Sequence, residues 1–573
     1  MLVIAEKPSV AKNIKMAINP PPTVIALRGH LLELDFPEEY SKWRSIDPRL
    51  LFHAPVKWTV RDSETYRELA KAVREAGILV LATDNDPEGE LIAYESLLTA
   101  KEFLGALPRY YRMRFNTVTP SELRRAWKSL ESDLKWNWVW KALLRQKFDL
   151  ITGAAYTRLL TLSKKLNNSD GVISWGSCQI PTLWFVYQRE MDIRNFKPEK
   201  YYVLSAILDA NGVKVKVSSE PIRDANGAKE IYALAKTAKY ALVAGFQLQD
   251  EIESKPLPTD TDSMLQDLSK IMGLSAARIM ALAESLYGDG YISYPRTETN
   301  MWLTVDHKSI LAMMSQTLLG KYVNMLNYSP RDGKKNDGAH PPIYPTAYYQ
   351  WLDDRGKVWE YIARRYLANV IGKDALLKRW KLQVNVNGLK LSATGRYFVN
   401  EGFYQVFPYF KPKDTLWIPQ LRAGDKLLVV EVNLEEKRTK PPPRLTESEL
   451  LRLLEQHSIG TDATRADYPQ IIIERGYAEK KRKSFYLSSL GEILINLLKD
   501  VDERLVTPDT RRYVEQLMAE VEVGKISVES ALKEAINIYE SLFEKVSIKL
   551  KTMKDISSEK ESKCPGTREK FNT

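Results

Sequence analysis

The sequence predicts a multidomain protein of mixed α/β and α+β class, with a parallel α/β domain at its N-terminus. Strand-like and helix-like segments alternate through about residue 116, which is the pattern of a parallel sheet. Farther along, β-rich pieces at 201–219, 381–393 and 425–434 flank a mainly helical stretch at roughly 253–376, which predicts a β unit interrupted by an inserted domain. The length of 573 residues allows about four domains of ~150 residues.

Short apolar runs predict the strands of the N-terminal domain. LVIA at 2–5, ILVLAT at 78–83 and YYRMRF at 110–115 have the length and composition of strands buried in a parallel sheet. Between them lie segments that predict helices, with Pro8 early in the first and Gly77 ending the second. These helices are expected over 8–18, 64–77 and 88–98.

Residues 120–190 are predicted to be helical, and the capping box Thr119-Pro120-Ser121-Glu122 marks where the first helix begins. The stretch carries a tryptophan-rich patch. We favour a packed interface for this patch over a base-stacking platform. Its members are Trp136, Trp138 and Trp140.

Two segments, 262–294 and 447–480, share the order helix, turn, helix, Gly-Tyr and strand. This order is typical of winged-helix units that sit on nucleic acid, although plain helical hairpins fit it equally well. KRTKPPPR at 437–444 predicts a basic, proline-rich linker. The lysine-rich stretch 546–573 is expected to be a flexible tail, and its Cys-Pro-Gly at 564–566 lacks the following cysteines that a zinc ribbon needs.

Composition excludes several classes of protein. No apolar run approaches the ~18 residues of a membrane helix, and the N-terminus lacks the layout of a signal peptide. Two distant cysteines, Cys178 and Cys564, exclude a disulfide framework and fit a reducing compartment. The net charge of +11 favours a polyanionic partner, for which nucleic acid is a candidate. No Walker phosphate loop is found, so ATP hydrolysis is not predicted.

An acidic constellation follows two of the predicted strands. Asp84, Asp86 and Glu88 come after the strand at 78–83, and Glu6 follows the first strand. If those strands are neighbours, the side chains converge at the carboxyl edge of the sheet, where ligands of parallel sheets collect. Carboxylates held together need a cation or raised pKa values, and an all-oxygen set favours Mg²⁺. A solvated, helix-capping acidic turn is the alternative for such a cluster.

A second constellation lies in GYISYPRTET at 290–299, which reads as a strand. Tyr294 and Arg296 are two residues apart, so on an extended chain they face the same way and can meet the same group. A tyrosine oxygen is a usable nucleophile when a cation stabilises the developing charge, and arginine suits a phosphate. Most tyrosines near arginines only pack. His340 in GAHPPI is a third candidate, as a donor or acid near a phosphate.

Taken together, these motifs resemble a type IA DNA topoisomerase of the topoisomerase III kind, from the archaeal and eukaryotic branch. The resemblance runs from Met1 to about residue 545. The matching pieces stand in the family's order, and seven such matches in order are not expected by chance. They are VIAEKPSVAKNI and DNDPEGE for the Toprim domain, FDLITGAAYTRLL and SWGSCQIPTL for the strand-binding helices, LYGDGYISYPRTET for the tyrosine segment, GAHPPIYPT for the histidine motif and GTDATRAD for the late threonine motif.

The resemblance implies a toroidal enzyme in which a tyrosine domain closes against the Toprim domain and lifts away as a gate. The activity it implies is ATP-independent: one DNA strand is cut through a 5′-phosphotyrosyl intermediate, another strand passes, and the cut is resealed, which relaxes negative supercoils or decatenates DNA. The implied division is a Toprim domain at 1–116, a helical strand-binding domain at 117–192 and 437–545, a β-rich arch at 193–252 and 377–436, a tyrosine domain at 253–376 and a flexible basic tail at 546–573.

The resemblance also implies roles for single residues. Tyr294 would be the nucleophile, and Glu6 the general acid for the leaving 3′ oxygen. Lys7 and Arg296 would hold the scissile phosphate, assisted by His340. Asp84, Asp86 and Glu88 would hold Mg²⁺ with Glu6 close by. The implied DNA-binding residues are Arg158, Ser174, Trp175, Gly176, Ser177, Cys178, Gln179 and Thr464.

The resemblance implies single-stranded or underwound duplex DNA as the partner, in a monomeric enzyme of the cytoplasm or, in a eukaryote, the nucleus. RNA as a substrate and a helicase as a partner are compatible with it. The chain departs from the family pattern at Pro87, where an arginine is usual, and in lacking C-terminal zinc ribbons. Two alternatives remain: a Toprim-type nuclease or primase-like enzyme without a covalent intermediate, and a non-catalytic DNA-binding scaffold.

Overall fold

The computed structural model describes residues 1–166, 171–323, 328–462 and 464–553. The N-terminal domain contains a four-stranded parallel sheet of order β2-β1-β5-β6, as the alternating pattern predicts. Its strands are β1 (Leu2–Ala5), β2 (Thr23–Ala26), β5 (Leu79–Ala82) and β6 (Tyr110–Arg112). A separate antiparallel pair consists of β3 (Leu32–Asp35) and β4 (Lys57–Val60).

Four helices accompany this sheet: α1 (Pro8–Ala17), α2 (Ser63–Glu75), α3 (Pro87–Leu104) and α4 (Pro120–Lys128). The predicted proline at a helix start recurs at Pro8, Pro87 and Pro120, where the missing N–H costs no hydrogen bond. Both faces of the sheet are buried, since Val3 and Ala5 join one hydrophobic cluster and Leu2 and Ile4 join another.

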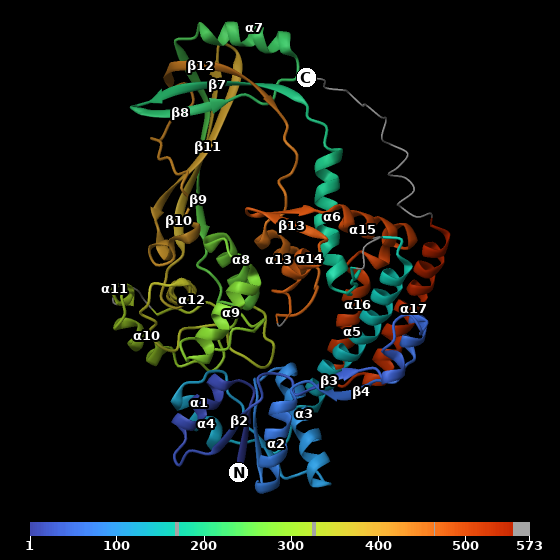
Figure 1. Ribbon diagram of the computed structural model, residues 1–573. Coiled ribbons are helices and arrows are strands. Elements are labelled where there is room, and N and C mark those ends of the chain that lie inside the picture. Colours follow the sequence, from blue (N-terminus) through green and yellow to red (C-terminus); the bar gives the residue numbers. More distant parts are fainter. Residues whose placement is uncertain (167–170, 324–327, 463, 554–573) are drawn as a thin grey trace, which may run out of the picture.

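A second body is mainly helical and is built from two stretches of chain that are distant in sequence (Figure 1). The first stretch gives the long helices α5 (Trp136–Ser163) and α6 (Gln179–Asn195). The second gives a small unit with an antiparallel hairpin, followed by three helices that pack on α5 and α6 around one core. Its elements are α13 (Glu447–Gln456), α14 (Tyr468–Glu474), β13 (Ala478–Lys481), β14 (Ser484–Leu487), α15 (Ser489–Val501), α16 (Asp509–Glu522) and α17 (Val528–Thr552).

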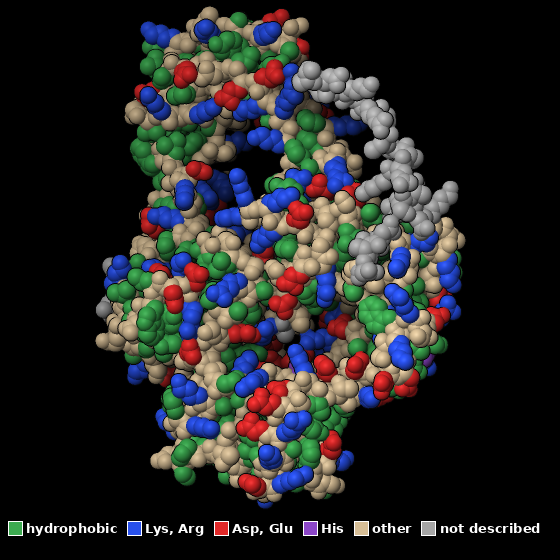
Figure 2. All heavy atoms as spheres, in the orientation of Figure 1, with side chains coloured by type: hydrophobic (Ala, Val, Ile, Leu, Met, Phe, Trp, Pro, Cys, Tyr) green, Lys and Arg blue, Asp and Glu red, His purple; other side chains and the backbone are tan. Residues whose placement is uncertain are grey.

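The two β-rich pieces of sequence form one closed barrel of order β10-β11-β8-β7-β12-β9, which we call the arch. Figure 1 places it at the opposite end of the molecule from the N-terminal domain, and Figure 2 shows an opening beneath it. Its elements are β7 (Lys200–Ala210), β8 (Val213–Ser218), α7 (Ala225–Lys236), β9 (Tyr240–Glu253), β10 (Ala375–Val386), β11 (Leu389–Asn400) and β12 (Lys426–Arg438).

The helical insertion between β9 and β10 is the tyrosine domain, and it lies against the N-terminal domain (Figure 1). One hydrophobic cluster runs from Val3 and Val80 of the parallel sheet to Tyr287, Ile292 and Tyr294 of the insertion. The two domains therefore share a buried contact around the predicted nucleophile. The helices of the insertion are α8 (Thr261–Met272), α9 (Ala276–Gly288), α10 (His307–Ser315), α11 (Gly320–Val323) and α12 (Asp354–Val370).

Three expectations need correction. The strand predicted at 290–299 does not form, because its backbone N–H groups donate to different segments. The N–H of Ser293 donates to the carbonyl of Tyr344, and that of Tyr294 donates to the carbonyl of Asn116. Within this segment the structure has only an isolated β-bridge at Ile292. The first proposed winged helix therefore lacks its strand, whereas the second has the β13–β14 hairpin. The tail begins later than predicted, because α17 continues to Thr552 with Val546 and Leu550 buried. The Cys-Pro-Gly at 564–566 lies outside the described residues.

No helix in the described ranges is both long and apolar enough to span a membrane.

Candidate active site

The carboxyl ends of β1 and β5 bring the first two acidic residues together. These strands pair in parallel with Ala5 opposite Ala82, so the residues that follow them meet at one edge of the sheet. The backbone N–H of Asp84 donates to Glu6 Oε2 at 3.1 Å. Lys7 Nζ lies 2.6 Å from Asp84 Oδ2 and 3.6 Å from Glu6 Oε1. One ammonium thus serves two carboxyl groups.

Asp86 links the acidic loop to the predicted nucleophile. Its Oδ1 caps helix α3 by accepting from the N–H of Gly89 at 2.7 Å, and its Oδ2 accepts from the hydroxyl of Tyr294 at 2.5 Å. The turn is so tight that a Cβ at Gly89 would lie 2.1 Å from the carbonyl oxygen of Asp84, so only glycine fits there. The DxDxEGE spacing therefore aims the second aspartate at Tyr294.

Tyr294 is enclosed, with 3% of its surface exposed. The ring of Tyr287 meets it edge-on at a centroid distance of 5.1 Å, and the ring of His340 lies at 4.8 Å. Lys7 Nζ is 5.9 Å from its centroid. Its backbone N–H donates to the carbonyl of Asn116 in the N-terminal domain at 2.9 Å. The hydroxyl is thus presented from one domain to the carboxylates of another.

The pKa values of the two carboxyl groups beside Lys7 are shifted in opposite directions. Burial, with the charge of Asp84 in addition, raises the pKa of Glu6 to about 8 although Lys7 acts in the opposite direction. Burial also disfavours ionised Asp84, but Lys7 outweighs it and holds the pKa of Asp84 below its ordinary value. At neutral pH, Glu6 therefore keeps its proton while Asp84 carries charge.

The phenol of Tyr294 is protonated in this state. Burial, followed by the charges of Asp86 and Asp84, raises its pKa well above the ordinary value, although Arg296 acts in the opposite direction. A buried phenol between carboxylates is a poor nucleophile until positive charge arrives near it. The hydroxyl of Tyr294 is therefore positioned at the carboxylates, but its raised pKa keeps it protonated and weakly nucleophilic.

Arg112 holds the acidic loop in shape, and sequence reasoning did not single it out. It is completely buried, and its Nε donates to Glu90 at 2.9 Å. Its terminal nitrogens donate to the carbonyl of Asp84 at 2.6 Å and that of Thr83 at 2.9 Å. Two further carbonyls, those of Leu81 and Met113, accept from it as well. The loop that carries Asp84 is therefore built around one guanidinium.

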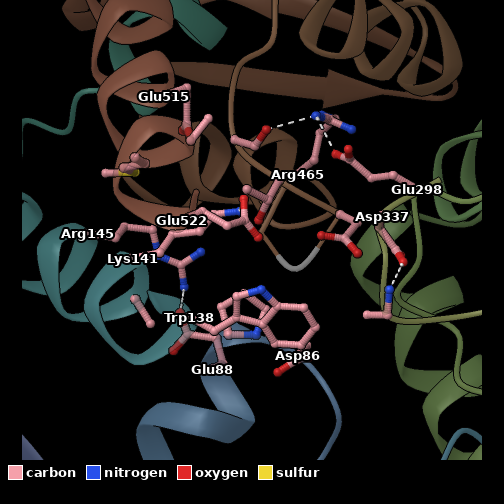
Figure 3. Close-up of a pocket in the computed structure, with 18 of the residues that line it drawn as sticks. Asp86, Glu88, Trp138, Lys141, Arg145, Glu298, Asp337, Arg465, Glu515 and Glu522 are labelled. Atoms are coloured by element: carbon pink, nitrogen blue, oxygen red, sulfur yellow. Dashed lines mark hydrogen bonds and ion pairs between the residues drawn. The ribbon is translucent and has the colours of Figure 1, made fainter. Parts of the chain in front are cut away.

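A cavity of about 590 Å³ opens beside Asp86, within the size range of ligand pockets. The N-terminal domain, α5, α16, the 458–465 loop and the tyrosine domain all contribute to its walls. Figure 3 shows Asp86, Glu88, Trp138 and Arg145 grouped at one end, with Arg465 and Glu298 opposite. The site therefore has an adjoining space where a strand could enter.

The comparisons agree with this geometry. The DNA topoisomerase family model matches residues 133–533, and the Toprim domain model matches residues 1–118. The chain belongs to the type IA DNA topoisomerase family. It is 33% identical to DNA topoisomerase 1 of Archaeoglobus fulgidus over 509 residues, covering 88% of this chain and 75% of the relative. It is 31% identical to DNA topoisomerase 3 of Dictyostelium discoideum, covering 91% and 68%.

The fold of this topoisomerase also matches a solved structure. Full-length topoisomerase I from Thermotoga maritima superimposes with a TM-score of 0.77 at 24% sequence identity, covering 95% of this chain and 90% of that one. The predicted toroidal class is confirmed, and the chain is a DNA topoisomerase enzyme that cleaves and passes DNA strands.

The enzyme brings most of the predicted catalytic residues together, and two point elsewhere. Six of them lie together at the carboxyl edge of the parallel sheet: Glu6, Lys7, Asp84, Asp86, Tyr294 and His340. Arg296 bonds through Nε to Glu284 at 2.8 Å. Glu88 forms an ion pair with Arg145 of α5 (Figure 3). It also bonds to His30 at 3.1 Å. Burial opposes ionised Glu88, but Arg145 and His30 outweigh it and lower its pKa to about 2.

The predicted DNA-binding residues in this topoisomerase are mostly core residues. Trp175 stacks on Tyr156 with centroids 4.3 Å apart, and Arg511 donates to Ser177 at 2.7 Å. Arg158 donates to the carbonyl of Tyr40 at 2.5 Å. Only Gly176 and Thr464 are partly exposed, and the buried ones are Arg158, Ser174, Trp175, Ser177, Cys178 and Gln179. A buried side chain cannot contact a strand in this state, so their role stays a prediction.

The tryptophan patch divides in the folded enzyme. Trp136 and Trp140 stack at 5.5 Å and meet Tyr94 edge-on, which confirms the packed interface for those two. Trp138 instead lines the cavity, with the ammonium of Lys135 3.7 Å from its ring centroid. The sequence spacing could have predicted this division. Each residue of a helix turns the chain by about 100°, so Trp138 lies about 200° from Trp136 and from Trp140 and faces the opposite side of the helix.

Proposed function

We propose that Tyr294 of this topoisomerase attacks the scissile phosphate to form the 5′-phosphotyrosyl intermediate, and that Glu6 protonates the leaving 3′ oxygen. The observation that carries the proposal is the 2.5 Å hydrogen bond from the Tyr294 hydroxyl to Asp86, across the contact between two domains. A P–O bond to the tyrosine forms as the P–O bond to the 3′ oxygen breaks, the phenol proton passes to the Asp86 carboxylate that already accepts it, and Glu6 gives its proton to the 3′ oxygen. Ester is exchanged for ester, so no ATP is needed.

Glu6 suits the acid role because its pKa of about 8 leaves it protonated near neutral pH. The reverse step uses the same group as a base, since resealing returns the proton from the 3′ hydroxyl. Lys7, already between Glu6 and Asp84, is placed to move toward a phosphate oxygen. Arg296 would do so by leaving Glu284, and His340 faces the ring of the nucleophile.

The residues present fit Mg²⁺ as the resident cation. Asp84 and Asp86 supply oxygen donors at one strand end, and Glu6 lies beside them. Among the residues that the structure describes, no three acidic, histidine or cysteine side chains are close enough to form a complete metal cluster, because Lys7, Tyr294 and Arg145 engage the carboxylates. When bound, Mg²⁺ would supply positive charge where the phosphate and the phenolate develop negative charge. Asp84 and Asp86 would hold it with Glu6 close by, and Glu88 would join them only by leaving Arg145.

Strand passage requires the tyrosine domain to leave the N-terminal domain. Besides the hydrogen bonds of Tyr294 to Asp86 and Asn116, two side-chain contacts to backbone join these domains: Asn13 donates to the carbonyl of Gly288 at 2.9 Å, and Asn85 donates to that of Ala339 at 3.2 Å. A second contact joins the tyrosine domain to the helical domain through the buried Arg465–Asp262 ion pair. We propose that both contacts open together as the gate, with the arch as the connection that stays closed.

The substrate we propose is single-stranded or underwound DNA, whose scissile phosphate would lie beside Tyr294 and Asp86. RNA is a second compatible substrate, because contacts to phosphates and stacking on bases do not depend on sequence. A helicase partner would supply such strands. The protein would act as a monomer within the cell, since one chain supplies both the nucleophile and the carboxylates.

The test is incubation of the protein and Mg²⁺ with a single-stranded oligonucleotide carrying label on the 3′ side of the cut. We expect the label to stay on the protein after denaturation, and peptide mapping should place it on Tyr294. A Toprim-type nuclease would instead release free 5′-phosphate ends with no labelled protein, and that result would contradict the covalent mechanism.

Trp138 offers a separate prediction about the strand path. Replacing it by alanine should weaken single-strand binding by about 5- to 150-fold, because base stacking on an aromatic ring contributes ~1–3 kcal/mol. Trp138→Phe should retain most of the affinity. Fluorescence anisotropy of a labelled oligonucleotide at fixed salt measures both. Trp351→Ala is the matched control, since that ring is 51% exposed on the tyrosine domain and lies outside the cavity. Equal effects at the two positions would contradict stacking at Trp138.

A further inference from the structure

Asp337 ties the histidine loop to the tyrosine segment. Its Oδ1 accepts from the backbone N–H groups of Ala339 and His340, each at 2.8 Å. Its Oδ2 accepts from the hydroxyl of Thr297 at 2.9 Å and lies 3.3 Å from His340 Nδ1. Thr297 is the third residue after Tyr294. One carboxylate therefore fixes the histidine ring and the segment that carries the nucleophile.

His340 has a ring nitrogen without a protein partner. The side chain is 3% exposed, and among the described residues its Nε2 has no hydrogen-bond partner. The residue lines the cavity beside Asp86, at whose edge Figure 3 shows Asp337. Leaving a buried polar atom unpaired is unfavourable, so a ligand that hydrogen-bonds to Nε2 would satisfy it. The ring is also 4.8 Å from that of Tyr294, which places Nε2 close to the reaction.

We propose that Asp337 is a positioning residue, which holds His340 through Nδ1 so that Nε2 donates a hydrogen bond to a phosphate oxygen of the scissile strand. This inference rests on the function proposed above and adds a residue to it. With Nδ1 directed at a carboxylate, the ring presents Nε2–H rather than a lone pair only when it is doubly protonated. The phosphate oxygen is an acceptor, so the donor state is the useful one.

The charges around His340 favour that state. Burial disfavours the imidazolium, but Asp337 outweighs it and raises the pKa of His340, and Asp86 and Asp462 act in the same direction. The charge of Asp84 also interacts favourably with the imidazolium. Tyr294, whose ring lies against that of His340, is neutral here because its own pKa is raised. Of these groups, only Asp337 forms hydrogen bonds to both the backbone and the ring of His340.

The alternative is that Asp337 only folds its own loop. Asp337→Asn separates the two roles, since an amide oxygen still accepts from the N–H groups of Ala339 and His340 while the negative charge is lost. Asp332→Asn is the matched control: Asp332 belongs to the same domain and accepts from a backbone N–H, that of Trp302, but does not line the cavity beside Asp86.

The experiment is single-turnover formation of the covalent adduct by the full chain with Mg²⁺ and oligonucleotide between pH 6 and pH 9. Asp337→Asn should come closest to the wild type near pH 6 and fall behind it by about 30-fold or more at pH 8, because burial disfavours the imidazolium once the carboxylate charge is lost and a histidine of ordinary pKa near 6.5 is already mostly neutral there. Asp332→Asn should keep the wild-type profile. In a His340→Gln background, adding Asp337→Asn should change the rate less than about twofold, because both act through one group.

Two results would overturn the inference: parallel pH profiles for Asp337→Asn and wild type, or independent effects of the two substitutions. A second measurement does not depend on the variant folding. In protein carrying ¹³C-histidine, with the His340 resonance assigned by its loss in His340→Gln, the ring should titrate above pH 6.5, and titration at or below that value would refute the proposal. A wild-type protein that forms no adduct at all would instead refute the proposed function.

Discussion

Tyr294→Phe is expected to abolish the covalent protein–DNA adduct and to lower strand cleavage by on the order of 10⁴-fold or more, as loss of an attacking nucleophile does in other enzymes. The change removes one oxygen, the donor to Asp86 Oδ2 at 2.5 Å. The ring remains packed between Tyr287 and His340, so the fold should survive. Denaturing gels with labelled oligonucleotide measure the adduct, and supercoil relaxation measures turnover.

Tyr287→Phe is the matched control for this prediction. Tyr287 is equally buried, its ring touches Tyr294, and its hydroxyl lies 3.5 Å from Asp84 Oδ1. Both variants therefore remove one phenol oxygen from the same acidic edge, but only one removes the proposed nucleophile. An adduct that persists in Tyr294→Phe, or that vanishes in Tyr287→Phe alone, would contradict the assignment.

Arg112→Met is expected to have the largest effect on stability, lowering the free energy of unfolding of the N-terminal domain by about 3–5 kcal/mol, as loss of one partner of a buried ion pair does. The guanidinium is completely buried, and its removal takes this donor from the carbonyls of Thr83 and Asp84 and leaves Glu90 with Arg114 as its ion-pair partner among the described residues. The midpoint of the first unfolding transition in urea measures the loss. Cleavage should fall too, since the backbone of Asp84 loses its anchor.

Arg125→Ala is the comparison for the buried arginine. Arg125 forms an i,i+3 ion pair with Glu122 at 2.6 Å, and 62% of its side-chain surface is exposed. Pairs of this kind contribute about 0–1 kcal/mol. Similar shifts of the midpoint in the two variants would mean that Arg112 does not organise the loop.

Local sequence predicted much of the active site because the chemistry-bearing residues stand at strand ends. A four-residue apolar strand followed by Glu6, and another followed by Asp84 and Asp86, predict convergence once the two strands are parallel neighbours, and the structure confirms that pairing. The nucleophile was predicted from a resemblance and from its spacing to Arg296. The extended strand assumed for that spacing was wrong, since the segment bonds irregularly to three other parts of the chain.

The contacts of charged side chains were harder to predict, because partners come from distant segments. Arg145 lies 57 residues from Glu88, yet it draws that carboxylate away from the other acidic groups. Buried Trp175 and Gln179 carry a motif that the resemblance linked to DNA, and packing in the helical core explains their burial here. The residue pattern of this motif cannot distinguish a packed core from a binding surface, since both favour the same residue types.

The sequence by itself determined the parallel sheet and the carboxylate pair at adjacent strand ends, because both depend on spacing within short segments, whereas the tyrosine and the histidine came from the resemblance to the family. Only the tertiary structure decided which groups are protonated, which carboxylate joins the cluster and which tryptophan faces the cavity. Those properties depend on burial and on charges contributed by other domains, and the distances that set them exist only after the chain has closed on itself.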